Sequence, residues 1–450
     1  MSNPRILLAA PASGSGKTMI TCGILQALHD RKLKVSSFKC GPDYIDPMFH
    51  EKVIGVRSGN LDRFFSDPET LCRLFCRNAE GTEISVVEGV MGYYDGLGGA
   101  TDEASTYQIA QALQAPVILI VNARGQSLSS LAELEGFMRF RADSGIRAVI
   151  FNQMSEQVFL SLKDDVQKMG VVPLGYVPRA DELVIESRHL GLVTPDEIGN
   201  LSRRLGDLAA LLENTLDLDA LIALANTAPD LCCPAAEALP EVPTTTIAVA
   251  RDEAFCFLYR DNLSLMERLG AKLLFFSPIH DQKLPEGTEG ILLPGGYPEL
   301  YAKALSENCS MRAAVANTVR SGMPCLAECG GFLYLHRELE DMDGKFYPMV
   351  GALDAKAWRT KHLGRFGYIT LTADAPSGIL EIGDRIRGHE FHYYESDSCG
   401  TAMTAEKPVG AKRWQCIHAE GNLLAGFPHM FYESNPHIIV RFLRRCAGEE

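Results

Sequence analysis

The sequence predicts an α/β protein built from two parallel-sheet domains. The chain has 450 residues, too many for one ordinary hydrophobic core. Short apolar runs alternate with stretches of helical spacing, which is typical of a parallel sheet covered by helices on both faces. This rhythm stops once, in a proline-containing segment, and then starts again. We therefore expect a first domain over residues 1–225, a linker over 226–245 and a second domain over 246–450.

The first domain begins with an apolar run, a glycine loop and a helix. Residues 5–10 read RILLAA, and Ile20, Ile24 and Leu28 have helical spacing within residues 17–30. This order of strand, loop and helix is the setting in which phosphate-binding loops occur. Further strands are expected at 34–40, 84–90, 116–123 and 146–152, with helices at 104–113, 128–143 and 197–225.

The second domain repeats the alternation and then changes character. Residues 346–428 are richer in short strands and turns than the part before them. No internal repeat or low-complexity tract is visible. The apolar runs that predict its parallel strands are 246–250, 271–276, 290–296 and 324–329.

Composition excludes several classes of protein. A hydrophobic share of 46% with 22% charged residues is that of a soluble globular chain. The net charge of −14 argues against nucleic-acid binding and against binding to anionic membranes. No apolar run is long enough for a membrane span, and the N-terminus lacks the pattern of a signal peptide. We expect a cytoplasmic protein.

The cysteines are expected to be reduced thiols, most of them small core residues. There are 13 of them, scattered and without a C-x-x-C motif. Cys72 and Cys76 lie one helical turn apart, but no second pair completes a zinc site. Adjacent Cys232 and Cys233 lie in the expected linker, where we interpret them as incidental.

The stretch APASGSGKT, residues 10–18, predicts a phosphate-binding loop. Pro11 stands where the usual pattern has its first glycine. The backbone N–H groups of Gly14, Ser15 and Gly16 could surround phosphate oxygens at a helix N-terminus. Lys17 would reach the β- and γ-phosphates of ATP, and Thr18 would bind Mg²⁺.

Acidic residues follow two other strands of the first domain. Glu88 ends the run ISVVE, and Asp43 and Asp46 follow the strand at 34–40. With Thr18, these carboxylates are the candidate Mg²⁺ ligands. Asn152 follows the strand at 146–152 and is a weaker candidate for reading the purine of ATP.

The second domain carries a candidate nucleophile. Cys329 follows an apolar run and precedes Gly330 and a helix, as in a nucleophile elbow, where the helix N-terminus would lower the thiol pKa. Gly295 and Gly296, with Gly330, offer N–H groups for an oxyanion hole. His429 follows a late apolar strand and is the candidate base.

These stretches identify the chain as similar to the cobyrinate a,c-diamide synthase family of cobalamin biosynthesis. The resemblance covers nearly the whole length, and its last part resembles class I glutamine amidotransferases. The long words FKCGPDYIDP and RGHEFHYY are its most specific parts. The matching words are APASGSGKT, FKCGPDYIDPMFH (38–50), NLD (60–62), VEGVMGYYDG (87–96), GYVPR (175–179), LPGGYPEL (293–300), CLAECGGFLYL (325–335) and RGHEFHYYE (387–395).

The resemblance implies a fold and two coupled reactions. It implies a dethiobiotin-synthetase-like P-loop domain followed by a flavodoxin-like class I amidotransferase domain. Glutamine would be hydrolysed through a glutamyl thioester, and its ammonia would displace phosphate from an acyl phosphate that ATP forms on the substrate. The implied ligands are ATP, Mg²⁺, glutamine and a tetrapyrrole polycarboxylate, and a homodimer stays open.

Residue roles carry over by position. The resemblance implies Cys329 as nucleophile and His429 as its base. It places Asp43, Asp46 and Glu88 at the metal and phosphate site. Tyr44 and Ile45, between the two aspartates, would contact the macrocycle.

The chain also departs from the common amidotransferase pattern. Phe431 stands where common class I enzymes have the Glu of their triad, so the third member is absent or comes from elsewhere. His437 lies in a polar segment that opens the last helix and is the wrong candidate for the base. His389 and His392 could face the macrocycle, another domain or, less expectedly, a metal ion.

Three alternatives stay open from sequence alone. Family relatives amidate nickel-sirohydrochlorin or hydrogenobyrinate, and the motifs do not separate these rings from cobyrinate. The chain could instead be a non-catalytic P-loop assembly ATPase with a degenerate glutaminase domain. An amidoligase like CTP synthase is disfavoured because that group usually keeps His-Pro-Glu where this chain has PHMF.

Overall fold

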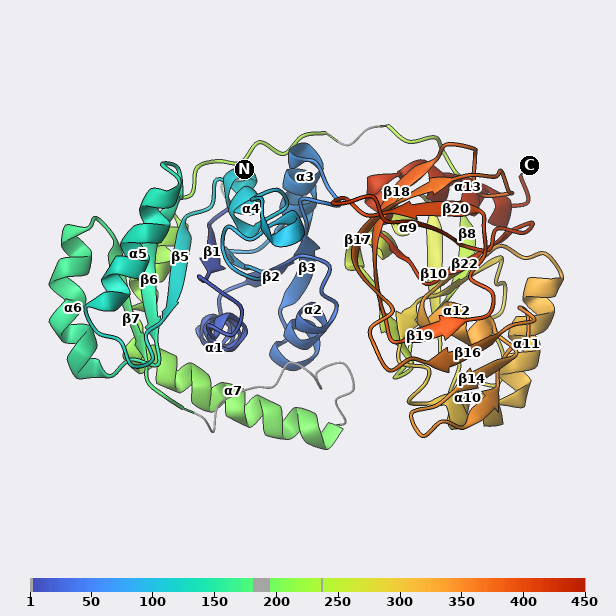
Figure 1. Ribbon diagram of the computed structural model, residues 1–450, viewed down its shortest axis with the longest axis horizontal. Coiled ribbons are helices and arrows are strands. Elements are labelled where there is room, and N and C mark those ends of the chain that lie inside the picture. Colours follow the sequence, from blue (N-terminus) through green and yellow to red (C-terminus); the bar gives the residue numbers. More distant parts are fainter. Residues whose placement is uncertain (1–2, 181–194, 236–237, 450) are drawn as a thin grey trace. The chain divides into compact units, whose positions relative to one another are not determined.

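The structure, a computed structural model, describes residues 3–180, 195–235 and 238–449, and the side chains of 195–199 are not described. It divides into one unit over Met1–Ala236 and another over Glu237–Glu450. Each unit has a central sheet with helices around it (Figure 1). No helix in the described ranges is both long and apolar enough to cross a membrane.

The first unit is built on a sheet of seven parallel strands in the order β3-β2-β4-β1-β5-β6-β7. This confirms the expected parallel sheet. Its strands are β1 Arg5–Ala9, β2 Val35–Cys40, β3 Arg57–Leu61, β4 Ile84–Glu88, β5 Val117–Asn122, β6 Ile146–Asn152 and β7 Val172–Val177.

Helices of this unit cover the sheet, and α1, α7 and α8 share one hydrophobic cluster with β1 and β5. Apolar strands buried on both faces are what such coverage requires. The helices are α1 Lys17–Asp30, α2 Ile45–Phe49, the π-helical turn His50–Ile54, α3 Pro68–Asn78, the 3₁₀ turn Leu97–Gly99, α4 Thr106–Leu113, α5 Ser129–Phe140, α6 Glu156–Lys168, α7 Pro195–Thr215 and α8 Leu218–Ala225.

The sequence pattern did not predict β3 or β7. The edge strand β3 reads RSGNL, which has few of the apolar or β-branched residues that mark a buried strand. The other edge strand, β7, contains Pro173 and Gly175. Pro is tolerated at a sheet edge, and a Cβ on Gly175 would lie 2.1 Å from the carbonyl oxygen of Thr215.

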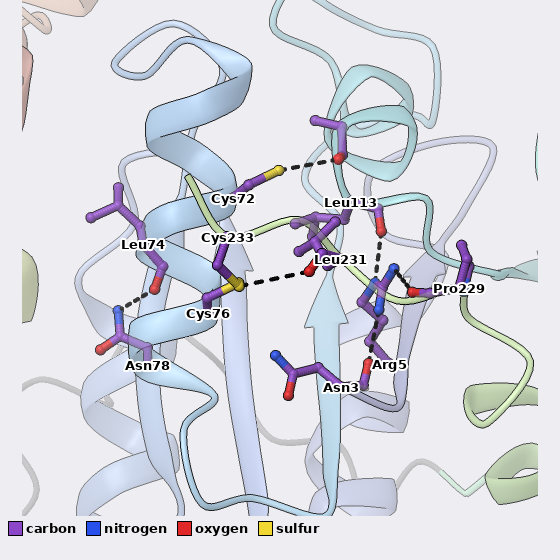
Figure 2. The surroundings of a disulfide bond; sticks show 11 residues. Asn3, Arg5, Cys72, Leu74, Cys76, Asn78, Leu113, Pro229, Leu231 and Cys233 are labelled. Atoms are coloured by element: carbon purple, nitrogen blue, oxygen red, sulfur yellow. Dashed lines mark hydrogen bonds between the residues drawn. A yellow bond between two sulfur atoms is a disulfide. The ribbon is translucent and has the colours of Figure 1, made fainter. Parts of the chain in front are cut away.

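The expectation of reduced cysteines is wrong for one pair, because Cys76 of α3 and Cys233 form a disulfide (Figure 2). The reason is that the first residues of the expected linker pack against the first unit. Leu231 is buried, and the Arg5 guanidinium donates to the Pro229 carbonyl at 2.8 Å. This packing brings together two cysteines 157 residues apart, with 6.2 Å between their Cα atoms. Residues 236 and 237 of the linker lie outside the described residues.

The second unit combines a parallel sheet with antiparallel ones. Its central sheet has the parallel order β10-β8-β11-β13-β22, which confirms the predicted strands. Its helices are α9 Arg260–Arg268, α10 Ala302–Glu307, α11 Cys309–Arg320, α12 Gly330–Leu335, the 3₁₀ turn Tyr432–Ser434 and α13 Pro436–Cys446.

The later part of this unit adds antiparallel strands, as its turn-rich sequence indicated. One sheet has the order β21-β20-β17-β18-β23, and another has β15-β14-β16-β19. The strands of the unit are β8 Thr245–Ala250, β9 Phe255–Phe257, β10 Ala271–Phe276, β11 Gly290–Leu293, β12 Gly295–Gly296, β13 Cys325–Glu328, β14 Glu338–Glu340, β15 Phe346–Pro348, β16 Lys356–Arg359, β17 Arg365–Ala373, β18 Arg385–His392, β19 Tyr394–Ser396, β20 Met403–Glu406, β21 Arg413–Cys416, β22 Leu423–Gly426 and β23 His429–Met430.

Candidate active sites

The glycine loop after β1 has the backbone of a phosphate-binding loop. Gly14 and Gly16 have φ values of 78° and 93°, in the left-handed region that favours glycine. Gly16 caps α1, and Lys17 is the first residue of that helix. The helix N-terminus and the turned backbone together suit an anion such as phosphate. Pro11 does not disrupt this conformation, because it precedes the glycines that have positive φ.

Lys17 lies across this loop. Its ammonium donates to the carbonyl oxygens of Met91 at 2.6 Å and Ala12 at 3.2 Å. Burial lowers the pKa of Lys17 to about 8, and the nearby Lys39 ammonium adds to the effect. A buried ammonium held by carbonyl oxygens can turn to an anionic phosphate at little cost, because the cation is already desolvated.

Asn152 contacts the loop itself. Its amide nitrogen donates to the Ser15 carbonyl at 2.9 Å, and its oxygen accepts from the N–H of Gln153. A Cβ on Gly16 would lie 2.2 Å from that amide nitrogen. The side chain expected to read a purine therefore holds the phosphate loop against the end of β6.

Glu88 at the end of β4 meets the start of α1. Its Oε1 accepts from the Thr18 hydroxyl at 2.6 Å. Its Oε2 is buried and finds no hydrogen-bond partner among the described residues. A buried carboxylate oxygen without a donor, beside a hydroxyl, fits an oxygen-ligated cation such as Mg²⁺.

The other two predicted metal ligands have different partners. Asp46 forms an ion pair with Lys39 at 2.5 Å. Asp43 accepts from the N–H groups of Ile45 and Asp46 and so turns the chain into α2. Within the described ranges no three His, Cys, Asp or Glu side chains form a metal-ligand group. Thr18 and Glu88 are thus the pair that the structure brings together.

Sequence reasoning missed Lys39, whose ammonium lies between Glu88 at 2.6 Å and Asp46. Burial opposes its charge, but the two carboxylates outweigh burial and raise the pKa of Lys39. Lys39 lies in β2, whose six residues are all buried, and belongs to the motif FKCGPDYIDP. A lysine near the end of a predicted strand, followed by two aspartates, was the signal that could have found it.

Tyr44 and Ile45 lie at the entry to α2, with Tyr44 buried and Ile45 partly exposed. Asn60 holds the preceding turn, since its amide donates to the carbonyl oxygens of Gly41 at 3.0 Å and Asp43 at 2.6 Å. Asn60 opens the word NLD, and sequence reasoning assigned it no role.

In the second unit Cys329 forms the predicted elbow between β13 and α12. Its φ of 45° and ψ of −99° are strained for a residue with a side chain, as at other nucleophile elbows. Its N–H donates to the Gly426 carbonyl at 2.8 Å. The expectation of a lowered thiol pKa is wrong: burial raises the pKa of Cys329, and the N–H of Gly330 only partly offsets this.

Three glycines pack tightly around His429 and the elbow. A Cβ on Gly295 would lie 2.3 Å from Cε1 of His429, and a Cβ on Gly330 would lie 2.9 Å from the nitrogen of Gly296. The structure therefore brings His429 and the three predicted oxyanion glycines together, and Gly330 directly follows Cys329 in the chain. Only glycine fits at these positions.

His429 is 2% exposed at the start of β23. Burial lowers its pKa well below the usual range, and His389 and His392 add to the effect. A neutral imidazole is the form that can accept a proton from a thiol. His437, by contrast, is exposed in the first turn of α13.

No acid stands at the usual triad position. Phe431 is buried and packs edge-on against Tyr259, with ring centroids 5.7 Å apart. Glu328 directly precedes Cys329, and its Oε1 accepts from the Tyr432 hydroxyl at 3.1 Å. Burial raises the pKa of Glu328 to about 8. Sequence reasoning missed this buried acid, although Glu328 directly precedes Cys329 in the sequence.

His389 and His392 turn to different surroundings. His389 stacks on His429, whereas His392 stacks on Phe427 and bonds to Glu390 at 3.2 Å. The two imidazoles therefore do not form a metal pair.

Comparison with known proteins assigns each unit to a domain family. Residues 6–193 match the CobQ/CobB/MinD/ParA nucleotide binding domain, and residues 246–437 match the CobB/CobQ-like glutamine amidotransferase domain. The fold and these matches define a P-loop nucleotide-binding domain joined to a glutamine amidotransferase domain.

The relatives narrow this class to one family. A cobyrinate a,c-diamide synthase of Caldanaerobacter subterraneus subsp. tengcongensis is 39% identical over 98% of this chain and 98% of its own length. That of Listeria innocua is 39% identical over 97% and 98%, and that of Dehalococcoides mccartyi is 38% identical over 100% and 99%. The chain belongs to the cobyrinate a,c-diamide synthase family.

Proposed function

We propose that this protein amidates the a- and c-acetate carboxylates of cobyrinate, with ATP as co-substrate and glutamine as nitrogen donor. The observation that carries the proposal is 39% identity to a cobyrinate a,c-diamide synthase along almost the whole of both chains. The nucleotide-binding and amidotransferase domains of the chain support the two half-reactions.

In the first unit a substrate carboxylate is activated. One of its oxygens attacks the γ-phosphorus of ATP, ADP leaves, and an acyl phosphate forms. The N–H groups of Gly14, Ser15 and Gly16 bind the phosphates, and Lys17 and Lys39 neutralise their charge. Thr18 and Glu88 would hold Mg²⁺, which lowers the charge of the nucleotide when bound. Asp43 and Asp46 shape the neighbouring turn, and Tyr44 and Ile45 contact the macrocycle.

In the second unit nitrogen is released from glutamine. Cys329 passes its proton to His429 while its sulfur attacks the side-chain amide carbon. The N–H groups of Gly296 and Gly330, beside Gly295, stabilise the oxyanion. His429 returns the proton to the departing nitrogen, which leaves as ammonia, and water hydrolyses the glutamyl thioester to glutamate.

The two half-reactions join in one amide. Ammonia attacks the acyl carbon of the acyl phosphate, inorganic phosphate leaves, and the new amide nitrogen loses a proton. A carboxylate is a poor electrophile, so the phosphate supplies the leaving group that the exchange needs. Repeating the cycle at the second acetate gives the diamide.

The proposal is tested by mass spectrometry of the tetrapyrrole after incubation with ATP, Mg²⁺ and glutamine. We expect cobyrinate to show two successive carboxylate-to-amide mass changes. Parallel reactions with nickel-sirohydrochlorin and hydrogenobyrinate test which tetrapyrrole is the substrate. Faster conversion of either than of cobyrinate would make that tetrapyrrole the substrate instead. If no ring is amidated and no glutamate forms, the chain is a nucleotide-dependent assembly protein instead.

A further inference from the structure

The ring of His429 is held between two strands of the second unit. On one side it meets Gly295, where a Cβ would come within 2.3 Å of Cε1. On another it stacks on His389, with ring centroids 4.9 Å apart and an angle of 14° between the planes. His389 and His429 are 6% and 2% exposed, so water hardly competes for either ring.

The stack is fixed by the backbone beneath it. His389 of β18 and His429 of β23 are directly opposite partners in an antiparallel pair. The pair is close because Gly388 has no side chain: a Cβ there would lie 2.3 Å from the carbonyl oxygen of His429. Tyr259 also contacts His389, with its hydroxyl 3.3 Å from Nδ1 of the imidazole.

We propose that His389 is the positioning residue for His429 and that it acts by stacking, where common class I enzymes use a carboxylate. The inference rests on the proposed roles of Cys329 and His429. Phe431 occupies the usual place of that carboxylate, so orientation has to come from another group.

Stacking suits this task because it engages the face of the imidazole, whereas proton transfer uses a nitrogen at its edge. A parallel ring restricts rotation of His429 about its side-chain torsions. Burial lowers the pKa of His389 to about 3, so this ring stays neutral while its neighbour takes up a proton. Two charged imidazoles at this separation would repel each other.

Two substitutions of similar size separate stacking from other roles. His389→Phe keeps a flat ring but loses the bond to Tyr259, and His389→Leu loses both. We expect His389→Phe to stay within about 3-fold of the parent kcat for glutamate release and His389→Leu to fall about 10- to 100-fold, because small misplacements of a catalytic group cost this much. The KM for glutamine should not change in either variant.

The assays use the full chain with ATP, Mg²⁺ and cobyrinate present. Equal kcat values for His389→Leu and the parent would overturn the proposal. So would a His389→Phe variant as slow as His389→Leu, because the effect would then run through the imidazole nitrogen. A rise in KM with unchanged kcat would make His389 a glutamine-binding residue and would also overturn it.

A second measurement keeps the outcome clear if a variant folds poorly. Amidation with free ammonia reports the folded first unit, and alkylation of Cys329 by a chloroketone analogue of glutamine reports how readily His429 activates the thiol. Alkylation should slow in His389→Leu and not in His389→Phe. His418→Phe removes a half-buried imidazole bonded to Ser398 and should behave as the parent. If the parent itself releases no glutamate, the proposed function fails, and that result is distinct from failure of this inference.

Discussion

The candidate site of the first unit is built from paired charges, whereas burial favours the uncharged forms of the proposed nucleophile and base in the second unit. At the phosphate loop, Lys39 lies between Glu88 and Asp46, within 2.6 Å of both. At the elbow, burial raises the pKa of Cys329 and lowers that of His429. Each arrangement fits its chemistry, since phosphoryl transfer needs counter-charge and proton transfer needs a thiol and a neutral base. The first two predictions below test this contrast, and the other two compare the stabilities of the units and of a buried acid.

The largest effect is expected at the nucleophile. Cys329→Ala should abolish glutamine-dependent amidation, a loss of at least about 10³-fold, because no other group can form the thioester. Amidation with high concentrations of free ammonia should persist, since the charged site is untouched. Both rates are measured by mass spectrometry of the product. Cys325→Ala, a buried thiol in the preceding strand, is the matched control. Loss of the ammonia reaction in Cys329→Ala would show that the two sites are not separable.

The next effect is expected at the charged site. Glu88→Gln should lower amidation about 10²- to 10³-fold with either nitrogen source, because the amide cannot replace a carboxylate that pairs with Lys39 and Thr18. Glu83→Gln, at the exposed turn before the same strand, is the control. Survival of ATP-dependent amidation in Glu88→Gln would remove this residue from the proposed metal site.

The disulfide lies in the first unit, so its reduction should destabilise that unit and leave the stability of the second unit unchanged. Opening Cys76–Cys233 should lower the unfolding free energy of the first unit by about 2–4 kcal/mol, as for other long loops. Calorimetry with and without a thiol reductant should show one transition that moves and one that does not. Cys233→Ser should reproduce the shift, and Cys232→Ser, with an exposed free thiol, should not. A shift of both transitions would contradict independent stabilisation.

The smallest effect concerns the acid beside the nucleophile. Burial raises the pKa of Glu328 from 4.5 to about 8, so the folded protein keeps a proton that the unfolded chain loses. Stability from this group is present below pH 4.5 and is lost as the pH rises toward 8, by about 1.4 kcal/mol for each pH unit at most. Glu328→Gln should be free of that loss. Chemical denaturation at several pH values should show the unfolding free energy of the variant rising relative to that of the parent between pH 4.5 and about 8. Curves of unfolding free energy against pH that run parallel for the two proteins would contradict this prediction.

Much of the fold was predictable because buried parallel strands leave long apolar runs. Apolar runs of this kind predicted β1, β4, β5, β6 and β8. The strands β3 and β7 did not, because edge strands carry polar residues, glycine and proline without penalty.

The candidate residues were predictable where a turn or strand end forces a residue type, as at Gly16 and Cys329. The partners that tertiary packing supplies were not. Lys39 and Glu328 needed knowledge of which side chains face inward together. The disulfide needed the path of a segment without periodicity, and the stack of His389 on His429 needed the register of two strands far apart in sequence.

The parallel imidazoles of His389 and His429 also limit how many protons this part of the amidotransferase unit can hold. With His429 as the proposed base, one proton leaves the thiol and departs with the nitrogen. A second proton on His389 would put like charges on two buried rings whose centroids are 4.9 Å apart. We therefore expect nitrogen to leave as neutral ammonia and not as ammonium, which has no lone pair with which to attack an acyl phosphate.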